Sequence, residues 1–233
     1  MIIGGLQPVT LLDYPQKVAA IIFTSGCNMR CSFCHNPELV LPELAKADSR
    51  RSVKKTINFL SDRKKYLDGV VITGGEPLMQ RGLFGFCRRL KKDGYEIKID
   101  TNGLLPAVLK KLIDKKLVNY LAMDIKGPLD DYERFCGVKV DSTKLAASIK
   151  IIKTSGLPYE FRSTLVKGLH RVSDFKKMLK TIKGAEKYYL QNFIFRDKLV
   201  GSDFKGKSFS PKELNNFLRL AGQQVKSCYL RSN

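Results

Sequence analysis

Long apolar runs are missing from this 233-residue chain, and acidic residues are scarce beside basic ones. The longest unbroken apolar run, from Val18 to Phe23, is far shorter than the ~18 residues that a membrane span needs. No basic residue precedes Lys17, so the start lacks the pattern of a secretory signal peptide. These absences argue against a helical membrane protein and predict a cytoplasmic one.

The charge balance is strongly basic, with 42 Lys and Arg against 22 Asp and Glu and a net charge of +20. Such a field attracts anions, acidic protein surfaces or nucleic acid. The basic residues are nevertheless spread as pairs over separate helical stretches. Two interpretations therefore stay open: solvated helix faces, or a surface for a polyanion or an acidic protein partner.

Length and a hydrophobic content of 43% suit a globular chain, and we expect one domain over residues 1–233. Strand and helix patterns alternate along it, which predicts an α/β fold with a parallel sheet. An open or partial barrel fits six such units, as does a doubly wound sheet. The segment 197–209 is expected to be irregular. The predicted strands are Val18–Thr24, Gly69–Thr73, Glu96–Asp100, Asn119–Ile125, Tyr159–Val166, Tyr188–Phe193 and Val225–Leu230, and the predicted helices are Val53–Lys64, Gly82–Lys92, Leu105–Lys115, Thr143–Thr154, Ser173–Lys183 and Pro211–Leu220.

Three of the six cysteines, Cys27, Cys31 and Cys34, share one loop, residues 26–37, directly after the first predicted strand. Their C-x3-C-x2-C spacing suits three corners of a cubic iron–sulfur cluster. The fourth iron would then stay open to a substrate, as a catalytic metal site requires. A zinc site completed by His35 or by a distant cysteine is the alternative.

The cysteine loop resembles that of the radical S-adenosylmethionine (radical SAM) superfamily. Its flanks, Gly26-Cys27-Asn28 and Cys34-His35-Asn36-Pro37-Glu38-Leu39, resemble activating enzymes of glycyl radical enzymes. The stretches Gly4-Gly5-Leu6-Gln7, Leu11-Leu12-Asp13-Tyr14-Pro15 and Lys17-Val18-Ala19 resemble, more narrowly, the activating proteins of anaerobic ribonucleoside-triphosphate reductase. The resemblance implies a partial (β/α)6 barrel with outer helices, a [4Fe-4S] cluster on Cys27, Cys31 and Cys34, and S-adenosylmethionine as cofactor.

The resemblance also implies cofactor contacts at the ends of successive strands. Gly74, Gly75 and Glu76 would meet the methionine amino group. The turn at Asp100, Thr101 and Asn102 and the strand end at Asp124 and Lys126 would contact the cofactor as well. Asp100, Thr101, Asp124 and the carbonyl of Ala122 can also hold a monovalent cation beside the cofactor carboxylate.

Four further residues are candidates. Arg162, inside a strand, would pair with the cofactor carboxylate if it faces the barrel interior; its alternative partner is Glu160. Phe33 can stack on adenine or pack in the core, and His35 can reach the cofactor. Gln191 stands on the sixth strand, where some activating enzymes carry a histidine. His170 is expected at the surface.

The implied reaction is anaerobic. The enzyme, an oxidoreductase, cleaves S-adenosylmethionine reductively and abstracts hydrogen from a glycine of a partner glycyl radical enzyme, here anaerobic ribonucleotide reductase. A low-potential donor such as flavodoxin or ferredoxin would supply the electron. The alternative is a radical SAM enzyme acting on a nucleobase, tRNA or other small substrate. A third possibility is a basic binding module with structural zinc. Cys87, Cys136 and Cys228 have no assigned role; Cys87 and Cys228 are expected to be buried or inert.

Overall fold

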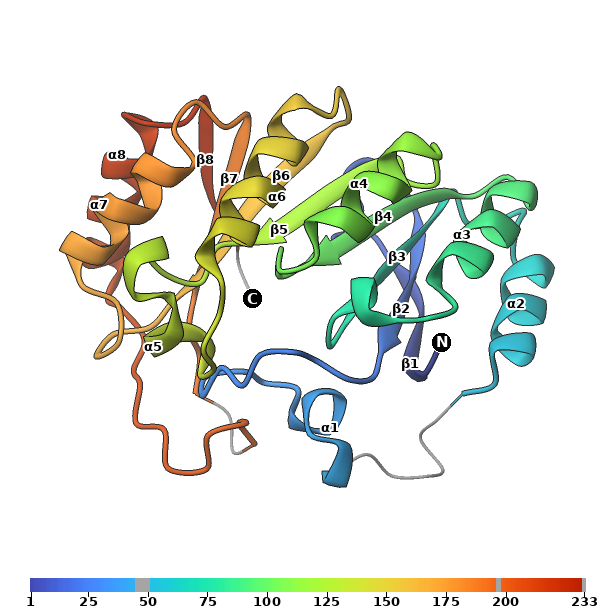
Figure 1. Ribbon diagram of the computed structural model, residues 1–233, viewed down its shortest axis with the longest axis horizontal. Coiled ribbons are helices and arrows are strands. Elements are labelled where there is room, and N and C mark those ends of the chain that lie inside the picture. The colour runs from blue at the N-terminus through green and yellow to red at the C-terminus, as the bar shows by residue number, and fades with distance from the viewer. Residues whose placement is uncertain (45–50, 196–197, 232–233) are drawn as a thin grey trace. The chain divides into compact units, whose positions relative to one another are not determined.

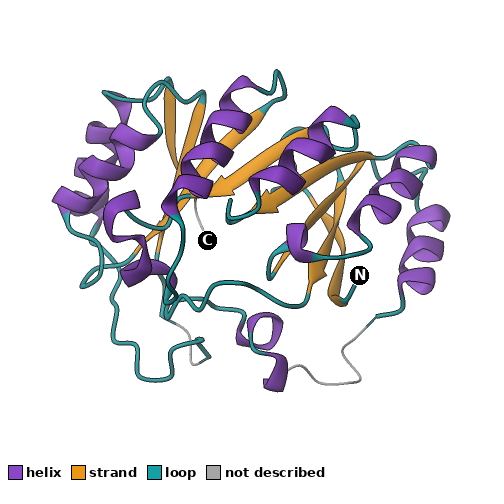
Figure 2. Cartoon of the chain, viewed as in Figure 1, coloured by secondary structure: helices purple, strands orange, loops and turns teal. Residues whose placement is uncertain are grey.

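The structure, a computed structural model, describes residues 1–44, 51–195 and 198–231. The chain forms two compact units. Unit 1 comprises Met1–Asn28, Asn36–Thr101 and Ala107–Leu121, and unit 2 comprises Met29–His35, Asn102–Pro106 and Ala122–Asn233. The single domain over residues 1–233 stays a prediction. Figure 2 shows strands and helices alternating along the chain, as the sequence patterns predict.

Unit 1 is built on four strands that lie side by side in chain order. The first pair, β1 and β2, is antiparallel, whereas β2, β3 and β4 are parallel. In the register of β2 and β3, Ala19 faces Gly69 and Thr24 faces Gly74, so the two strands end together. The strands are β1 (Ile3–Thr10), β2 (Ala19–Thr24), β3 (Gly69–Gly74) and β4 (Glu96–Thr101), and the helices of this part of the chain are α1 (Pro37–Val40), α2 (Val53–Asp62), α3 (Leu83–Lys92) and α4 (Pro106–Asp114).

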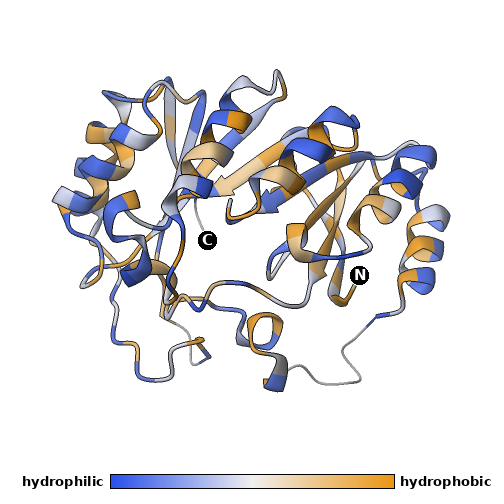
Figure 3. Ribbon diagram, viewed as in Figure 1, coloured by the Kyte–Doolittle hydropathy of each residue, from blue (hydrophilic) through white to orange (hydrophobic). Residues whose placement is uncertain are grey.

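The core of unit 1 lies along its central strands. Ile21 and Ile22 of β2 and Val70 and Val71 of β3 are all buried, although neighbours along a strand point to opposite faces. Strands buried on both faces are typical of parallel sheets covered by helices. Figure 3 shows β2 and β3 in the colours of hydrophobic residues, while the helices carry both colours.

Unit 2 continues the alternation. Strand β5 (Tyr120–Asp124) begins in unit 1 with Tyr120 and Leu121, and its last three residues belong to unit 2. Strands β6 (Tyr159–Leu165), β7 (Lys187–Asn192) and β8 (Ser227–Arg231) follow one another as parallel neighbours. Helix α8 (Pro211–Gly222) packs against α7 (Val172–Thr181), β7 and β8 (Figure 1). The remaining helices are α5 (Tyr132–Cys136) and α6 (Ser142–Thr154).

Among the described residues, the sequence patterns do not predict strand β1 or the short helices α1 and α5. Strand β1 contains Gly4, Gly5 and Pro8, which are poor strand formers, and Pro is tolerated because β1 stands at an edge. The irregular segment is confirmed for residues 198–209, which hold only an isolated bridge at Lys207; Asp197 lies outside the described residues. No helix in the described ranges is both long and apolar enough to cross a membrane.

Replacing Tyr95 with Phe tests the packing of unit 1. The Tyr95 ring is 1% exposed, and its hydroxyl donates a hydrogen bond of 2.6 Å to the Leu60 carbonyl in α2. Removing the donor leaves a buried carbonyl with one partner fewer, so Tyr95→Phe is expected to lower the free energy of unfolding by about 1–2 kcal/mol in urea. Tyr66→Phe, at a site 74% exposed, is the matched control and is expected to change nothing measurable. Equal effects of both variants would contradict this account of the core.

Candidate active site

The turn after β2 is held against the turn after β3. The amide of Gly75 donates to the Thr24 carbonyl and the amide of Glu76 donates to the Gly26 carbonyl, each at 2.8 Å. A Cβ on Gly75 would lie 2.1 Å from the Gly26 oxygen, so only glycine fits. Both bonds follow from the register that ends β2 and β3 together. The residue before Cys27 is thereby fixed to the Gly-Gly-Glu-Pro turn.

Glu76 is a buried carboxylate within unit 1, with only 1% exposure. Its Oε1 accepts hydrogen bonds from the Leu78 amide at 3.0 Å and from the Thr101 hydroxyl at 2.8 Å. Buried charges persist in proteins when they are hydrogen-bonded or paired. Glu76 is therefore held in place beside the end of β4; its contact with the methionine amino group, which the family resemblance implies, stays a prediction.

Asp100 already has a cationic partner within unit 1. The Lys98 ammonium lies 2.7 Å from its Oδ1, and the Lys98 side chain is fully buried. Lys98 is not among the residues singled out from the sequence, although residues two apart on a strand share a face. A protein cation thus neutralises one carboxylate of the predicted monovalent-cation site.

The three clustered cysteines divide between the units: Cys27 belongs to unit 1, and Cys31 and Cys34 belong to unit 2. All are thiols, not disulfides. The Cys34 amide donates to the Cys31 carbonyl at 3.0 Å, which makes a tight turn. In the part of the chain that the structure describes, no three His, Cys, Asp or Glu side chains form a ready-made metal group. Three thiol donors nevertheless fit an iron–sulfur cluster by their chemistry.

A cluster of charges in unit 2 centres on Asp124 at the end of β5. Its Oδ1 accepts a hydrogen bond of 2.9 Å from Arg162 Nε, and its Oδ2 lies 3.4 Å from Lys126 Nζ. Burial by itself lowers the pKa of Lys126, but nearby groups, of which the Asp124 carboxylate contributes most, raise it above its usual value.

Two residues that were not predicted to contact the site, Tyr132 and His170, hold this strand end. The Tyr132 hydroxyl accepts a hydrogen bond from the Lys126 amide at 3.1 Å. His170, expected at the surface, is 4% exposed, so that expectation is wrong. Its Nε2 lies 2.9 Å from the Lys126 carbonyl oxygen, to which it donates, and its Nδ1 accepts from the Val166 amide at 3.1 Å. Burial lowers the pKa of His170, which favours this neutral, doubly hydrogen-bonded ring.

The remaining predicted contacts also lie in unit 2. Phe33 is buried and packs edge-on to His170, with ring centroids 6.2 Å apart. The His35 ring stacks on Phe193, and its Nε2 bonds the Ile194 carbonyl oxygen at 2.8 Å. Asn102 accepts from the Leu104 amide at 3.1 Å. Gln191 lies at the end of β7, with its Oε1 3.5 Å from the Thr164 hydroxyl.

The two charged residues of β6, Arg162 and Glu160, have different ion-pair partners. Arg162 binds Asp124, whereas Glu160 is fully buried and lies 3.4 Å from Arg231 of β8. Arg162 thus has Asp124 as an ion-pair partner, and Glu160 has Arg231.

Three cysteines stand apart from the loop. Burial raises the pKa of Cys87 to about 12 and that of Cys228 to about 11, so both thiols are protonated and inert at neutral pH. The Cys136 thiol donates to the Val138 carbonyl at 3.1 Å, and burial raises its pKa as well.

Comparison with known proteins gives the family. The model of the Radical SAM superfamily matches residues 21–182, more than half of the chain. A protein of Methanocaldococcus jannaschii, described as a proposed glycyl-radical enzyme activating enzyme, is 34% identical over 230 residues, covering 97% of this chain and 92% of that one. The 7-carboxy-7-deazaguanine synthase of Methanopyrus kandleri is 27% identical over 197 residues, covering 74% and 72%.

A solved structure of SuiB from Streptococcus suis bound to S-adenosylmethionine has the same fold, with a TM-score of 0.67 at 15% identity. The match covers 91% of this chain and 52% of that one, so the chain spans about half the length of SuiB. The chain therefore belongs to the radical SAM superfamily, and the predicted partial barrel, the [4Fe-4S] cluster and S-adenosylmethionine are confirmed as properties of that family.

Replacing Gly75 with Ala tests the close approach of the two turns. The added Cβ would overlap the Gly26 oxygen, and crowding of this kind costs about 1–3 kcal/mol of stability. We expect Gly75→Ala to unfold earlier and to retain less iron after anaerobic reconstitution.

The matched control is Gly85→Ala in α3, where nothing lies within 4 Å of the new Cβ. Inside a helix this change should stabilise by roughly 0.5–1 kcal/mol and leave the iron content unaltered. Wild-type stability and iron content in Gly75→Ala would show that the two turns need no such contact.

Proposed function

We propose that this chain is an activating enzyme of a glycyl radical enzyme, with anaerobic ribonucleoside-triphosphate reductase as the partner. One observation carries the proposal: a C-x3-C-x2-C loop in a chain that is 34% identical, over 97% of its length, to a protein described as such an activating enzyme. The N-terminal stretch through Lys17-Val18-Ala19, which resembles the reductase activating proteins, supports the choice of partner.

Cys27, Cys31 and Cys34 would hold the [4Fe-4S] cluster. When bound, the cluster and S-adenosylmethionine supply a one-electron reductive cleavage and a hydrogen-atom abstraction. The protein keeps the thiols competent for this role. Lys126 offers positive charge to Cys31 and Cys34, and the Glu76–Gly26 hydrogen bond fixes the backbone before Cys27.

Cofactor contacts are proposed for each unit separately. In unit 1, Gly74, Gly75 and Glu76 would bind the amino group of the methionine moiety, since Glu76 is a buried negative charge. In unit 2, Arg162 and Lys126 would bind its carboxylate, and Asp124 orients both cations. Asp100 and Thr101 are further proposed contacts in unit 1. Phe33, His35, Asn102 and Gln191 are further proposed contacts in unit 2. A monovalent cation is a further proposed ligand, for which Lys98 already competes at Asp100.

The overall reaction balances without an acid–base residue. One electron and one S-adenosylmethionine, together with a glycine C–H bond of the partner, give methionine, 5′-deoxyadenosine and one glycine-centred radical. The electron would come from a low-potential donor of the flavodoxin or ferredoxin class. Because a hydrogen atom moves rather than a proton, the chain has to supply only position and exclusion of water.

A small-molecule substrate is the second candidate. The likeness to 7-carboxy-7-deazaguanine synthase, 27% over 197 residues, favours a purine-like substrate over other small molecules. The higher identity and wider coverage of the activating-enzyme relative favour the first proposal.

Formation of 5′-deoxyadenosine tests the proposed chemistry. Protein reconstituted anaerobically with iron and sulfide, reduced with dithionite and mixed with S-adenosylmethionine is expected to release 5′-deoxyadenosine, measured by chromatography. Cys31→Ala should abolish the product because the cluster loses a ligand. The control is Cys228→Ala, whose thiol has a pKa raised to about 11 and should be dispensable. No product from protein with a full cluster, even with the reductase present, would refute the proposal.

A further inference from the structure

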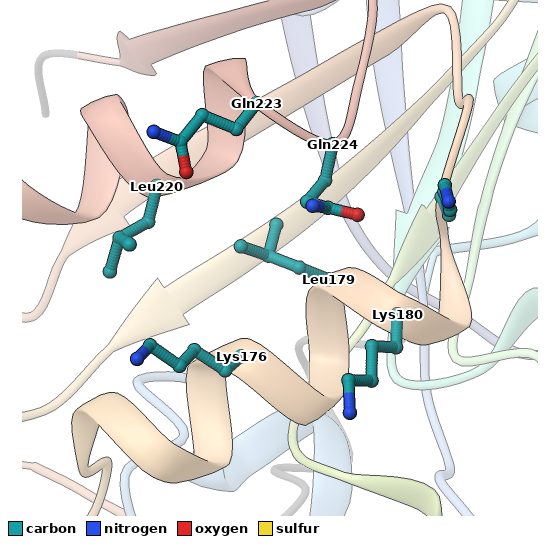
Figure 4. A pocket seen from close by; sticks show the side chains of 7 residues that line it. Lys176, Leu179, Lys180, Leu220, Gln223 and Gln224 are labelled. Atoms are coloured by element: carbon teal, nitrogen blue, oxygen red, sulfur yellow. The ribbon is translucent and has the colours of Figure 1, made fainter.

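Two surface grooves flank helix α7 within unit 2. One, of about 410 Å³, lies between α7 and the end of α8, and its walls include Lys176, Lys180 and Lys183. Figure 4 shows Leu179 on the α7 side of this groove and Leu220 on the α8 side. The other groove, of about 280 Å³, lies between α6 and α7.

The second groove is lined in the same way. It carries Lys150 and Lys153 over an apolar floor that includes Ile149 and Ala146. The two grooves adjoin at the end of α7, where Lys153 Nζ donates to the Lys183 carbonyl at 2.6 Å. Both grooves thus share a pattern of exposed lysines over buried aliphatic side chains such as Leu179 and Ile149.

The positive charge of these grooves has no local compensation. Residues 142–154, 175–185 and 214–224, which form their walls, contain no Asp or Glu. None of the five lysines takes part in an ion pair among the described residues, whereas nearby Lys177 pairs with Asp130 and Lys226 with Glu186. Lys176 and Lys180 are also four residues apart on one helix, a like-charge spacing that destabilises a helix slightly.

We infer that these two grooves form a docking surface for an acidic, amphipathic segment of a partner protein. Aliphatic floors suit the apolar face of such a segment, and the lysines suit its carboxylates. Nucleic acid fits less well, because binding of single strands uses aromatic stacking and arginine, and neither residue type lines the grooves. This inference shares one premise with the proposed function, namely that the chain acts on a partner protein.

The test uses a fluorescein-labelled helical peptide of leucine and glutamate, with leucines at i, i+3, i+4 and i+7, and follows fluorescence anisotropy. Changing Lys150, Lys153, Lys176, Lys180 and Lys183 together to Gln should raise the Kd about tenfold. The control changes five exposed lysines elsewhere, Lys54, Lys55, Lys65, Lys92 and Lys115, to Gln, and so removes the same total charge. It should raise the Kd by about twofold at most.

Equal losses in the two variants, or no binding of the peptide, would overturn the inference. So would a single-stranded DNA probe that binds more tightly than the peptide and depends on the same five lysines. Binding of the peptide needs neither cluster nor S-adenosylmethionine, and both variants should keep 5′-deoxyadenosine formation. A failure here is therefore distinct from a failure of the proposed chemistry.

A separate observation concerns the irregular segment Lys198–Phe209, here named the strap. Its Val200 amide donates to the Cys34 carbonyl and its Gly201 amide donates to the Ser32 carbonyl, both at 3.0 Å. A Cβ on Gly201 would lie 2.8 Å from the Ser32 Cβ, so glycine permits this backbone contact. The strap also carries Phe204, whose ring centroid lies 6.3 Å from that of Phe33.

The other end of the strap is anchored on the sheet of unit 2. Lys207 exchanges two backbone hydrogen bonds with Lys167, at 2.8 and 3.0 Å. The Asn192 amide group bonds both the amide and the carbonyl of Phe209, each at 2.9 Å. A segment without helix or strand is thus held at both ends by hydrogen bonds.

We propose that Gly201 is a positioning residue for the cysteine loop, since the strap fixes the backbone at Ser32 and Cys34. Gly201→Ala should separate the strap from the loop. Alkylation of Cys34 by iodoacetamide in the cluster-free protein, followed by mass spectrometry, should then quicken about tenfold relative to wild type. In the loaded protein, iron loss to a chelator should quicken too, and the electron paramagnetic resonance signal should broaden.

Ser32→Gly removes the nearest clashing atom, although the Ser32 Cα and carbonyl oxygen would still lie 3.0 and 3.1 Å from the new Cβ, and should restore part of the wild-type protection from alkylation in the double variant. Gly222→Ala, where nothing lies within 4 Å of the new Cβ, is the control and should match wild type. An unchanged Cys34 rate in folded Gly201→Ala, or no rescue by Ser32→Gly, would overturn the role of Gly201.

Discussion

The contact on which the candidate site depends is the one between two backbones, at Gly75 and Gly26. No side chain fits between them, since a Cβ on Gly75 would lie 2.1 Å from the Gly26 oxygen. Register sets the contact up: Thr24 and Gly74 end neighbouring parallel strands, so the next residues of both meet. The cysteine loop therefore starts at a fixed point beside the buried carboxylate of Glu76. Parallel α/β folds place their active sites at such strand ends.

Charge is organised differently inside the protein and on its surface. Two acidic groups of the candidate site each have a nearby cation of their own unit: Lys98 for Asp100, and Arg162 for Asp124. These pairs hold the proposed cofactor contacts in place before any ligand binds, which limits the entropy lost on binding. The surplus behind the net charge of +20 includes exposed lysines of α6 and α7 that lack such partners. We therefore propose two separate roles for charge: the inner ion pairs orient the cofactor contacts, and the exposed lysines recognise a partner protein.

Local patterns in the sequence predicted most strands, most helices and the positions of the motifs, because strand ends and turn residues are local signals. Strand β1 could not be predicted from the sequence, because Gly4, Gly5 and Pro8 oppose strand formation and the strand forms by pairing with β2. The burial of His170 could not be predicted for a related reason, because it depends on contacts with Phe33 and Phe135, which are distant in sequence. The pairing of Asp124 with Arg162, 38 residues apart, likewise needed the fold. The Lys98–Asp100 pair was within reach of the sequence, since residues two apart share a strand face.

The central claim is that the chain removes a hydrogen atom from a glycine of another protein. In the most direct measurement, the chain is mixed with anaerobic ribonucleotide reductase that has been labelled with α-deuterated glycine. S-adenosylmethionine and a reductant are added, and the 5′-deoxyadenosine formed is analysed by mass spectrometry. The account predicts deuterium in the 5′-deoxyadenosine and a glycine radical signal on the reductase. Formation of 5′-deoxyadenosine without deuterium, and without that signal, would contradict it and direct attention to a small purine-like substrate.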